Sequence, residues 1–142
     1  FDTYQLEDAE VAVVVANSTA GTAKTVVDEL RQEGIKAGLL KPRVFRPFPA
    51  EELAGSLGHL KAVAVMDRSV SFGAMDNAGP LFLEIAADLA LHGVRIPMAG
   101  YVYGLGGRDI STAEIDSVYR DLLRAAETGE VKRRVTYLGV RE

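Results

Sequence analysis

Polar residues that could do chemistry follow three apolar runs of the sequence. Asn17-Ser-Thr-Ala-Gly-Thr22 follows the first run, Asp67-Arg68 ends another, and Gly104-Leu-Gly-Gly-Arg-Asp109 follows the last. In open α/β sheets, ligands bind beyond the carboxyl ends of the strands. These three stretches are therefore the candidate sites.

The stretch Asn17–Thr22 offers hydroxyls and backbone N–H groups at the start of an expected helix, which can hold an anion. It matches neither G-x-G-x-x-G nor G-x-x-x-x-G-K-[ST]. The second strand ends in Lys41-Pro42-Arg43, without an acidic ribose ligand. The sequence therefore favours a helix cap made by Ser18 or Thr19 over a ligand site.

The stretch Gly104–Asp109 contains three glycines, which permit backbone conformations closed to other residues;. One interpretation is a phosphate cradle. We favour the alternative, a tight turn that presents Arg108 and Asp109 to a neighbouring domain.

Charged residues also end two neighbouring strands. Asp67 and Arg68 end one of them, and Arg43 and Arg46 lie beyond the other. Pairing among these groups, or across an interface, is more common than catalysis. A buried Asp–Arg pair requires good hydrogen-bond geometry.

The composition excludes several kinds of site. The 142 residues include no Cys, so this stretch holds no disulfide, zinc-thiolate site or Cys-ligated iron–sulfur cluster;. His59 and His92 are far apart, which argues against a His-based metal site or a Ser-His-Asp triad. A net charge of −4 argues against nucleic-acid binding and suits a cytoplasmic protein;. No apolar run is long enough to span a membrane.

Expected strands alternate with expected helices, which predicts an α/β fold with a mainly parallel sheet. The expected strands are Thr3–Leu6, Glu10–Ala16, Ile35–Val44, Leu60–Met66 and Ile96–Val102, and the expected helices are Thr22–Gln32, Ala50–Leu57, Leu81–Leu91 and Thr112–Glu127.

Local features sharpen this assignment. The unbroken, valine-rich apolar run Val11–Val15 predicts a central strand buried on both faces;. Ser111 and Glu114 form a capping box for the last helix. The helix Leu81–Leu91 is so apolar that we expect it to be covered on more than one side. Residues 131–142 form either an extra strand or an inter-domain arm.

Three strings together resemble one family. They are Asn17–Lys24, Arg43-Val-Phe-Arg-Pro-Phe-Pro49 and Gly104–Ile110, supported by Asp67-Arg68 and Ser71-Phe-Gly73. Their order and spacing resemble the C-terminal part of the α subunit of pyruvate:ferredoxin oxidoreductase and its 2-oxoacid:ferredoxin oxidoreductase relatives. Asn17 departs from the family, in which a glycine usually precedes the serine; an asparagine can keep left-handed backbone geometry there.

The resemblance implies a fold and a domain organisation. The fold is three-layer α/β/α, like the C-terminal domain of transketolase, with a mostly parallel five-stranded sheet whose first short edge strand is antiparallel. The implied spatial order is Thr3–Leu6, Ile35–Val44, Glu10–Ala16, Ala62–Met66 and Ile96–Val102. Because the sequence begins without Met, we expect residues 1–142 to be one domain of a longer chain.

The resemblance also implies a function. Such a domain is a structural and assembly part of an enzyme that oxidatively decarboxylates pyruvate or a similar 2-oxoacid to acyl-CoA and reduces ferredoxin. Thiamine diphosphate with Mg, iron–sulfur clusters and coenzyme A belong to the whole enzyme, so no catalytic, cofactor or metal residue is assigned here. The implied partners are the thiamine-binding domain of the same chain, other subunits and ferredoxin.

Eight residues are expected at interface or anion contacts: Ser18, Thr19, Arg43, Arg46, Asp67, Arg68, Arg108 and Asp109. Two alternatives remain open at this point. One is an independent nucleotide- or anion-binding α/β module, and the other is the C-terminal domain of a different thiamine diphosphate enzyme.

Overall fold

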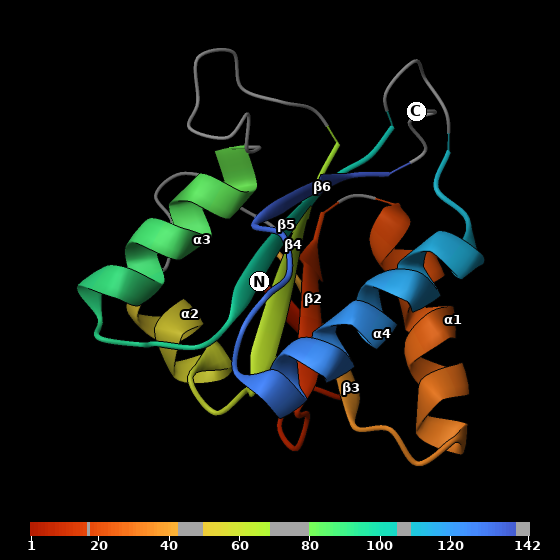
Figure 1. Cartoon of the computed structure of the whole chain (residues 1–142), viewed down its shortest axis with the longest axis horizontal. Helices are drawn as coiled ribbons and strands as arrows, with labels where there is room; N and C mark the ends of the chain where they lie inside the picture. The colour runs from red at the N-terminus through yellow and green to blue at the C-terminus, as the bar shows by residue number, and fades with distance from the viewer. Residues whose placement is uncertain (17, 43–49, 69–79, 105–108, 139–142) are drawn as a thin grey trace.

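The computed structural model describes residues 1–16, 18–42, 50–68, 80–104 and 109–138. They form a six-stranded sheet in the order β1-β3-β2-β4-β5-β6, flanked by helices (Figure 1). The strands are β1 (Asp2–Tyr4), β2 (Val11–Val15), β3 (Ala37–Lys41), β4 (Ala62–Asp67), β5 (Met98–Val102) and β6 (Val135–Tyr137). The helices are α1 (Thr19–Gln32), α2 (Ala50–Leu57), α3 (Pro80–Leu91) and α4 (Thr112–Thr128).

Strand β2 is the middle of the sheet, as its apolar run predicts. It pairs in parallel with β3 on one side and β4 on the other. All of its side chains are fully buried, because helices cover both faces of the sheet. Val11, Val13 and Val15 pack on one side, whereas Ala12 and Val14 pack on the other.

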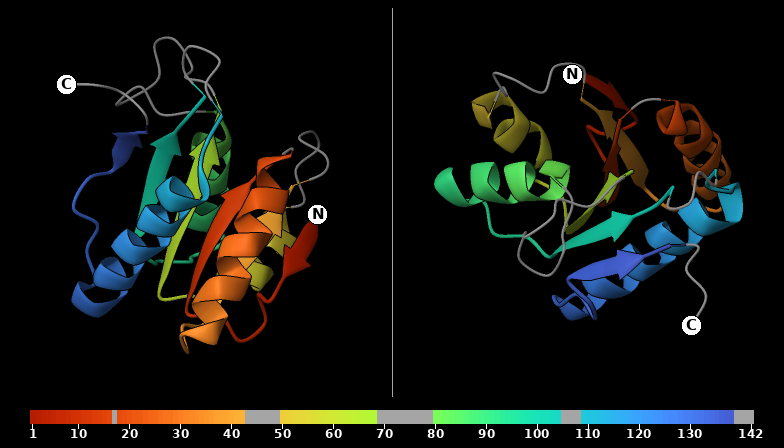
Figure 2. Two further views of the ribbon diagram at one scale, coloured as in Figure 1. Left: turned by 90° about the vertical axis from the view of Figure 1, so that its right-hand side faces the viewer. Right: turned by 90° about the horizontal axis from the view of Figure 1, so that it is seen from above.

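The helices form two layers around the sheet, which confirms the three-layer α/β/α prediction. Helices α1 and α4 cover one face, and α2 and α3 cover the other (Figure 2). The first layer buries Val26 and Leu30 of α1 against Ile115 and Val118 of α4 and the sheet. The second layer contributes Leu53 and Leu57 of α2, and Leu81, Phe82 and Leu89 of α3.

The edge strands differ in detail from the expectation. Strand β1 pairs antiparallel with β3, as predicted, but it ends at Tyr4 because Gln5 takes a φ of 52°, which is incompatible with an extended strand;. The sheet has six strands rather than the expected five. The additional strand β6 pairs in parallel with β5, and Val135 packs on the α2–α3 side of the core.

The helix ends follow their capping residues. Ser111 and Glu114 form the predicted capping box of α4, and Gly129 ends that helix in the left-handed conformation. Helix α1 begins at Thr19 rather than Thr22, because Thr19 and Ala20 are already buried against the core. Strand β3 ends at Lys41, directly before Pro42, since proline lacks the N–H that a ladder needs;.

Helix α3 departs from its prediction. Leu81, Phe82, Ile85 and Leu89 are buried against the sheet and α2. Its opposite side stays open in the described part of the chain, where Leu91 is 81% exposed. The expected cover on more than one side is therefore not provided by these residues.

Candidate functional site

Asp67 lies at the carboxyl end of β4 and holds the start of helix α3. Its Oδ1 accepts a hydrogen bond from the backbone N–H of Leu81 (2.8 Å), and its Oδ2 accepts one from that of Phe82 (3.0 Å). Asp67 is only 6% exposed. A carboxylate there satisfies N–H groups that have no partner inside the helix and complements the positive end of its dipole. We call this contact the Asp67 clamp.

The environment of Asp67 shifts its pKa in opposing ways. Burial raises the pKa of the carboxyl above its usual range, and the hydrogen bonds from Phe82 and Leu81 lower it; burial is the larger effect;. The side chain is thus a buried structural acceptor. Among the described residues it pairs with backbone N–H groups and not with an arginine, so the predicted Asp–Arg pair is not found there.

Thr19 and Ser18, the two expected caps, differ in their surroundings. Ser18 occupies the N-cap position of α1 and is exposed, but its side chain makes no capping hydrogen bond, so the predicted cap is wrong for this residue. Thr19 is the first helical residue and is buried, and its Oγ1 accepts a hydrogen bond from the hydroxyl of Tyr103 (3.0 Å). The hydroxyl of Thr19 is thus engaged inside the domain.

Arg68 lies against the backbone that leaves strand β5. A Cβ built on Gly104 would approach Cγ of Arg68 to 2.9 Å, and Gly104 itself has a φ of +76°. Glycine is required here both for the left-handed conformation and for the close approach of the Arg68 side chain. The contact brings Arg68 to the start of the Gly104–Asp109 string.

The carboxyl edge therefore brings together part of the predicted set. Asp67 and Arg68 meet Gly104 at this edge, and Asp109 is exposed beyond it. Arg43, Arg46 and Arg108 lie outside the described residues, as do Asn17 and the stretches 43–49 and 69–79. Among the predicted site residues that the structure describes, Ser18, Arg68 and Asp109 are exposed to solvent. Their polar side chains suit contacts with a neighbouring surface.

The described residues contain no cluster of His, Asp and Glu that could hold a metal ion. His59 and His92 lie apart, each within hydrogen-bond distance of a backbone carbonyl (2.8 Å). A search of the described helices finds none with the length and hydropathy needed to cross a membrane.

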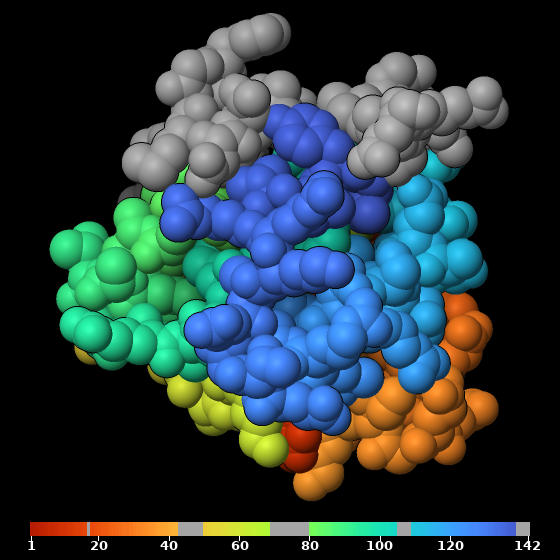
Figure 3. All heavy atoms as spheres, in the orientation of Figure 1, coloured from red at the N-terminus to blue at the C-terminus, as the bar shows by residue number. Residues whose placement is uncertain are grey.

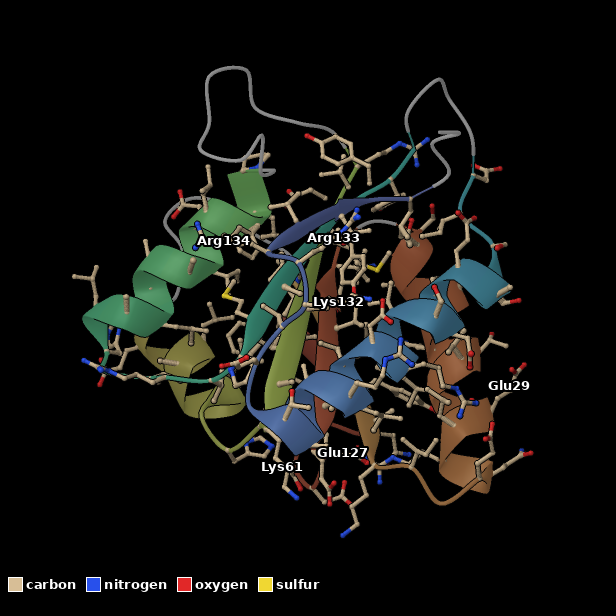
Figure 4. The ribbon with its side chains drawn as sticks, in the orientation of Figure 1. Glu29, Lys61, Glu127, Lys132, Arg133 and Arg134 are labelled. Carbon is tan, nitrogen blue, oxygen red and sulfur yellow. The ribbon has the colours of Figure 1, made fainter. Side chains whose placement is uncertain are left out.

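A cavity of about 720 Å³ lies between α4, β5 and β6, and none of the predicted site residues that the structure describes lines it. Its walls include Ala99, Leu122, Ala125 and Val131, and its polar groups include Tyr101, Asp121, Arg124, Lys132 and Arg133. Lys132 and Arg133 lie on the segment that connects α4 to β6 (Figure 4). The basic run 132–134 is the one sequence signal that could have indicated this surface.

Within this cavity, the polar groups at its wall are linked. The hydroxyl of Tyr101 donates to Oδ2 of Asp121 (3.1 Å), and Asp121 also pairs with Arg124. Burial, together with the neighbouring charge of Asp121, raises the pKa of Tyr101 above its ordinary value. Tyr101 is therefore a neutral hydrogen-bond donor near pH 7 rather than a base.

The sheet order, the antiparallel first strand and the two helix layers define a domain of the transketolase C-terminal type. A split-gene transketolase, solved as an inactive β4 tetramer, shares this fold with a TM-score of 0.68 at 19% identity, over 93% of this chain and 42% of the other. The 2-oxoglutarate:ferredoxin oxidoreductase from Magnetococcus marinus, solved with 2-oxoglutarate, coenzyme A and succinyl-CoA bound, gives 0.68 at 22% identity, over 86% of this chain and 19% of the other.

Sequence comparison is more specific than the fold. Residues 9–115 match the family described as pyruvate:ferredoxin oxidoreductase core domain II. The chain is 45% identical to pyruvate synthase subunit PorA of Thermotoga maritima over 139 residues. This aligned stretch covers 98% of this chain and 34% of the relative. It is 39% identical to ketoisovalerate oxidoreductase subunit VorA of Pyrococcus horikoshii, over 96% of this chain and 34% of the relative.

This chain belongs to the pyruvate:ferredoxin oxidoreductase core domain II family. It spans about a third of the length of these relatives. The family suggested by the strings at Asn17–Lys24, Arg43–Pro49 and Gly104–Ile110 is thereby confirmed.

Proposed function

We propose that this chain is a structural and assembly domain in the α subunit of a 2-oxoacid:ferredoxin oxidoreductase. The observation that carries the proposal is the match of residues 9–115 to the family, extended over nearly the whole chain by relatives named as subunits of pyruvate synthase and ketoisovalerate oxidoreductase. The assembled enzyme would oxidatively decarboxylate pyruvate or a similar 2-oxoacid, transfer the acyl group to coenzyme A and reduce ferredoxin.

The local chemistry supports a structural role for this domain. At the carboxyl edge, Asp67 and Thr19 are buried and bonded to groups of the same domain. Asp67 is only 6% exposed and both of its oxygens already accept a backbone N–H group, so it presents little surface to a substrate. We therefore assign no catalytic residue to the described part of the chain.

The cofactors of the whole enzyme would be held elsewhere. The residues do not fit a thiolate-ligated iron–sulfur cluster, because the sequence contains no Cys;. We place thiamine diphosphate with Mg, the clusters and coenzyme A on other domains or subunits of a cytoplasmic enzyme. The thiamine-binding domain of the same chain is the expected neighbour, and residues 1–142 form one domain of that longer chain.

Activity of the assembled enzyme tests this proposal. The complex that contains this domain is purified anaerobically, and the reduction of ferredoxin is followed with pyruvate, 2-oxoisovalerate or 2-oxoglutarate. We expect reduction that requires both a 2-oxoacid and coenzyme A, and no turnover by the isolated 142-residue chain. Turnover of pyruvate by the isolated chain, or no reduction with any 2-oxoacid by the complex, would contradict the proposal.

Charge reversal tests the proposed contacts at the carboxyl edge. Arg68 is exposed there, so Arg68→Glu should lower the yield of assembled enzyme without unfolding the domain. Lys36→Glu is the matched control. Lys36 is exposed and directly precedes strand β3, so it lies at the amino ends of the parallel strands, opposite the carboxyl edge. Equal yields of the two variants in size-exclusion chromatography would remove Arg68 from the interface.

A further inference from the structure

Two cations without a bonded partner line the cavity between α4, β5 and β6. Lys132 and Arg133 belong to Lys132-Arg133-Arg134, the only run of three consecutive cationic residues in a chain of net charge −4. Both residues are exposed at the cavity wall. In the described part of the chain, neither side chain forms a hydrogen bond or an ion pair. Lysine and arginine in this position are available as donors to an anion.

The other charged groups of the cavity define what else a ligand must bring. Arg124 is paired with Asp121, which also accepts the hydroxyl of Tyr101. The carboxylate of Glu130 lines the cavity as well, and it forms no hydrogen bond or ion pair with the described residues. The lining thus holds three cations and two carboxylates. Since a carboxylate only accepts hydrogen bonds, a fitting ligand carries donors in addition to its negative charge.

The floor of the cavity is apolar. Ala99 of β5 and Leu122 and Ala125 of α4 are buried at its base, and Val131 lies beside them. Figure 3 shows this face of the molecule, with α4 and the segment that leads into β6 both in blue. The volume of about 720 Å³ is suited to a small molecule;. An apolar floor with a few polar groups above it is the usual composition of a small-molecule pocket.

We propose that this cavity binds a nucleoside diphosphate. The diphosphate supplies negative charge for Lys132 and Arg133, the ribose hydroxyls supply donors for Glu130, and the base covers the apolar floor. A guanidinium binds two phosphate oxygens at once through its planar N–H groups, and an ammonium acts as a point charge. The inference goes beyond the proposed function and does not depend on it, because it stands on the lining of this cavity alone.

Simpler anions match fewer of these groups. Inorganic phosphate engages the two cations but leaves the apolar floor without contact. A fatty acid covers that floor but brings no donor for Glu130. A nucleoside diphosphate combines the charge, the donors and the flat apolar surface in one molecule.

Photoaffinity labelling of the assembled enzyme locates the site. The probe is azido-adenosine diphosphate, whose base bonds covalently to nearby residues on irradiation, and the labelled peptides are identified by mass spectrometry. We expect label on peptides that contain Ala125, Val131 or another residue of the cavity wall. No label on these peptides, including label found only elsewhere in the enzyme, would overturn the inference.

Competition at the labelled peptides identifies the groups that are recognised. ADP should suppress the labelling, whereas inorganic phosphate and adenosine should each compete at least about tenfold more weakly. Failure of ADP to compete would overturn the inference. So would equal competition by phosphate, which indicates a general anion site, or by adenosine, which shows that the charges are not used.

A matched pair of charge reversals gives a second measurement. Arg133→Glu removes a cation from the cavity, and Lys36→Glu makes the same change at an exposed position that does not line it. We expect Arg133→Glu to raise the probe concentration for half-maximal labelling by about tenfold or more, because a charge-assisted hydrogen bond is lost. Lys36→Glu should stay within about twofold of the native chain. Equal values for the two variants would overturn the inference.

The two proposals fail in different ways. Reduction of ferredoxin with a 2-oxoacid is measured in the same preparation without ADP. An active enzyme that is not labelled at the cavity contradicts only the nucleotide site, whereas a labelled but inactive preparation contradicts only the proposed function.

Discussion

Replacement of Asp67 tests how strand β4 holds helix α3. In Asp67→Ala the backbone N–H groups of Leu81 and Phe82 lose their acceptors, at 2.8 and 3.0 Å. In Asp67→Asn one amide oxygen remains as an acceptor, and the amide NH₂ replaces the other. The alanine variant therefore removes the Asp67 clamp, and the asparagine variant removes about half of it.

The magnitude follows from the hydrogen bonds and from burial. A hydrogen bond to a charged group contributes about 1.5–3 kcal/mol, and replacing a good N-cap by Ala costs about 0.5–2 kcal/mol. The burial that raises the pKa of Asp67 offsets part of this gain. We expect a loss of about 2–3 kcal/mol in the free energy of unfolding for Asp67→Ala, and about 1–2 kcal/mol for Asp67→Asn.

The pH dependence has a defined sign. Because burial raises the pKa of Asp67 above its ordinary value of 3.8, the folded state binds this proton more tightly than the unfolded chain. Protonation of Asp67 therefore adds to the free energy of unfolding. This contribution is fully present below the pKa that Asp67 has in the unfolded chain, and it is lost as the pH rises through the pKa that Asp67 has in the folded state. The stability advantage of the native chain over Asp67→Asn should therefore be larger at about pH 4 than at about pH 7.

Urea unfolding of the 142-residue chain, followed by circular dichroism at both pH values, provides the measurement. Asp109→Asn is the control, because Asp109 is exposed near the same edge of the sheet and should change stability by less than about 0.5 kcal/mol;. An advantage that grows with pH would refute the dominance of burial. Equal stability of Asp67→Ala and the native chain would refute the Asp67 clamp itself.

Three further substitutions test packing and capping by the same unfolding measurement. Gly100→Ala should cost about 1–3 kcal/mol, because its Cβ would lie 2.8 Å from the ring of Phe82; an unchanged midpoint would show that the ring moves freely. Ser111→Ala should cost about 1 kcal/mol by removing the capping box with Glu114;, and a loss of helicity should accompany it. Tyr119→Phe should cost about 1–2 kcal/mol, because its hydroxyl donates to a buried carbonyl of β3 at 2.7 Å; a neutral result would mean that this carbonyl finds another donor.

Local sequence patterns predicted the parts of the fold that depend on neighbouring residues. Val11–Val15 is an unbroken apolar run in which every residue but Ala12 is a valine, so its burial on both faces and its central place followed from the local sequence alone. The Ser111–Glu114 capping box and the end of β3 before Pro42 likewise depend on residues a few positions apart.

Contacts between distant residues were not predictable in this way. The hydrogen bond from Tyr103 to Thr19 joins residues 84 positions apart, and it places the first turn of α1 inside the core. Asp67 was expected to meet an arginine, but the start of α3, 14 positions later, supplies N–H groups that bind its carboxylate directly. A single sequence does not show which of several possible partners lies nearest in space. For the same reason the sequence left residues 131–142 open between an extra strand and an inter-domain arm, since the three residues of β6 become a strand only beside β5.

The Asp67 clamp also bears on which residues the start of helix α3 requires. Its hydrogen bonds fix the last residue of β4 to the first turn of α3, so the carboxyl end of this strand and the start of the helix form one unit. Both donors are backbone N–H groups, which every residue except proline carries. The clamp therefore makes no demand on the side chains at positions 81 and 82, and it depends in evolution on the carboxylate at position 67 alone.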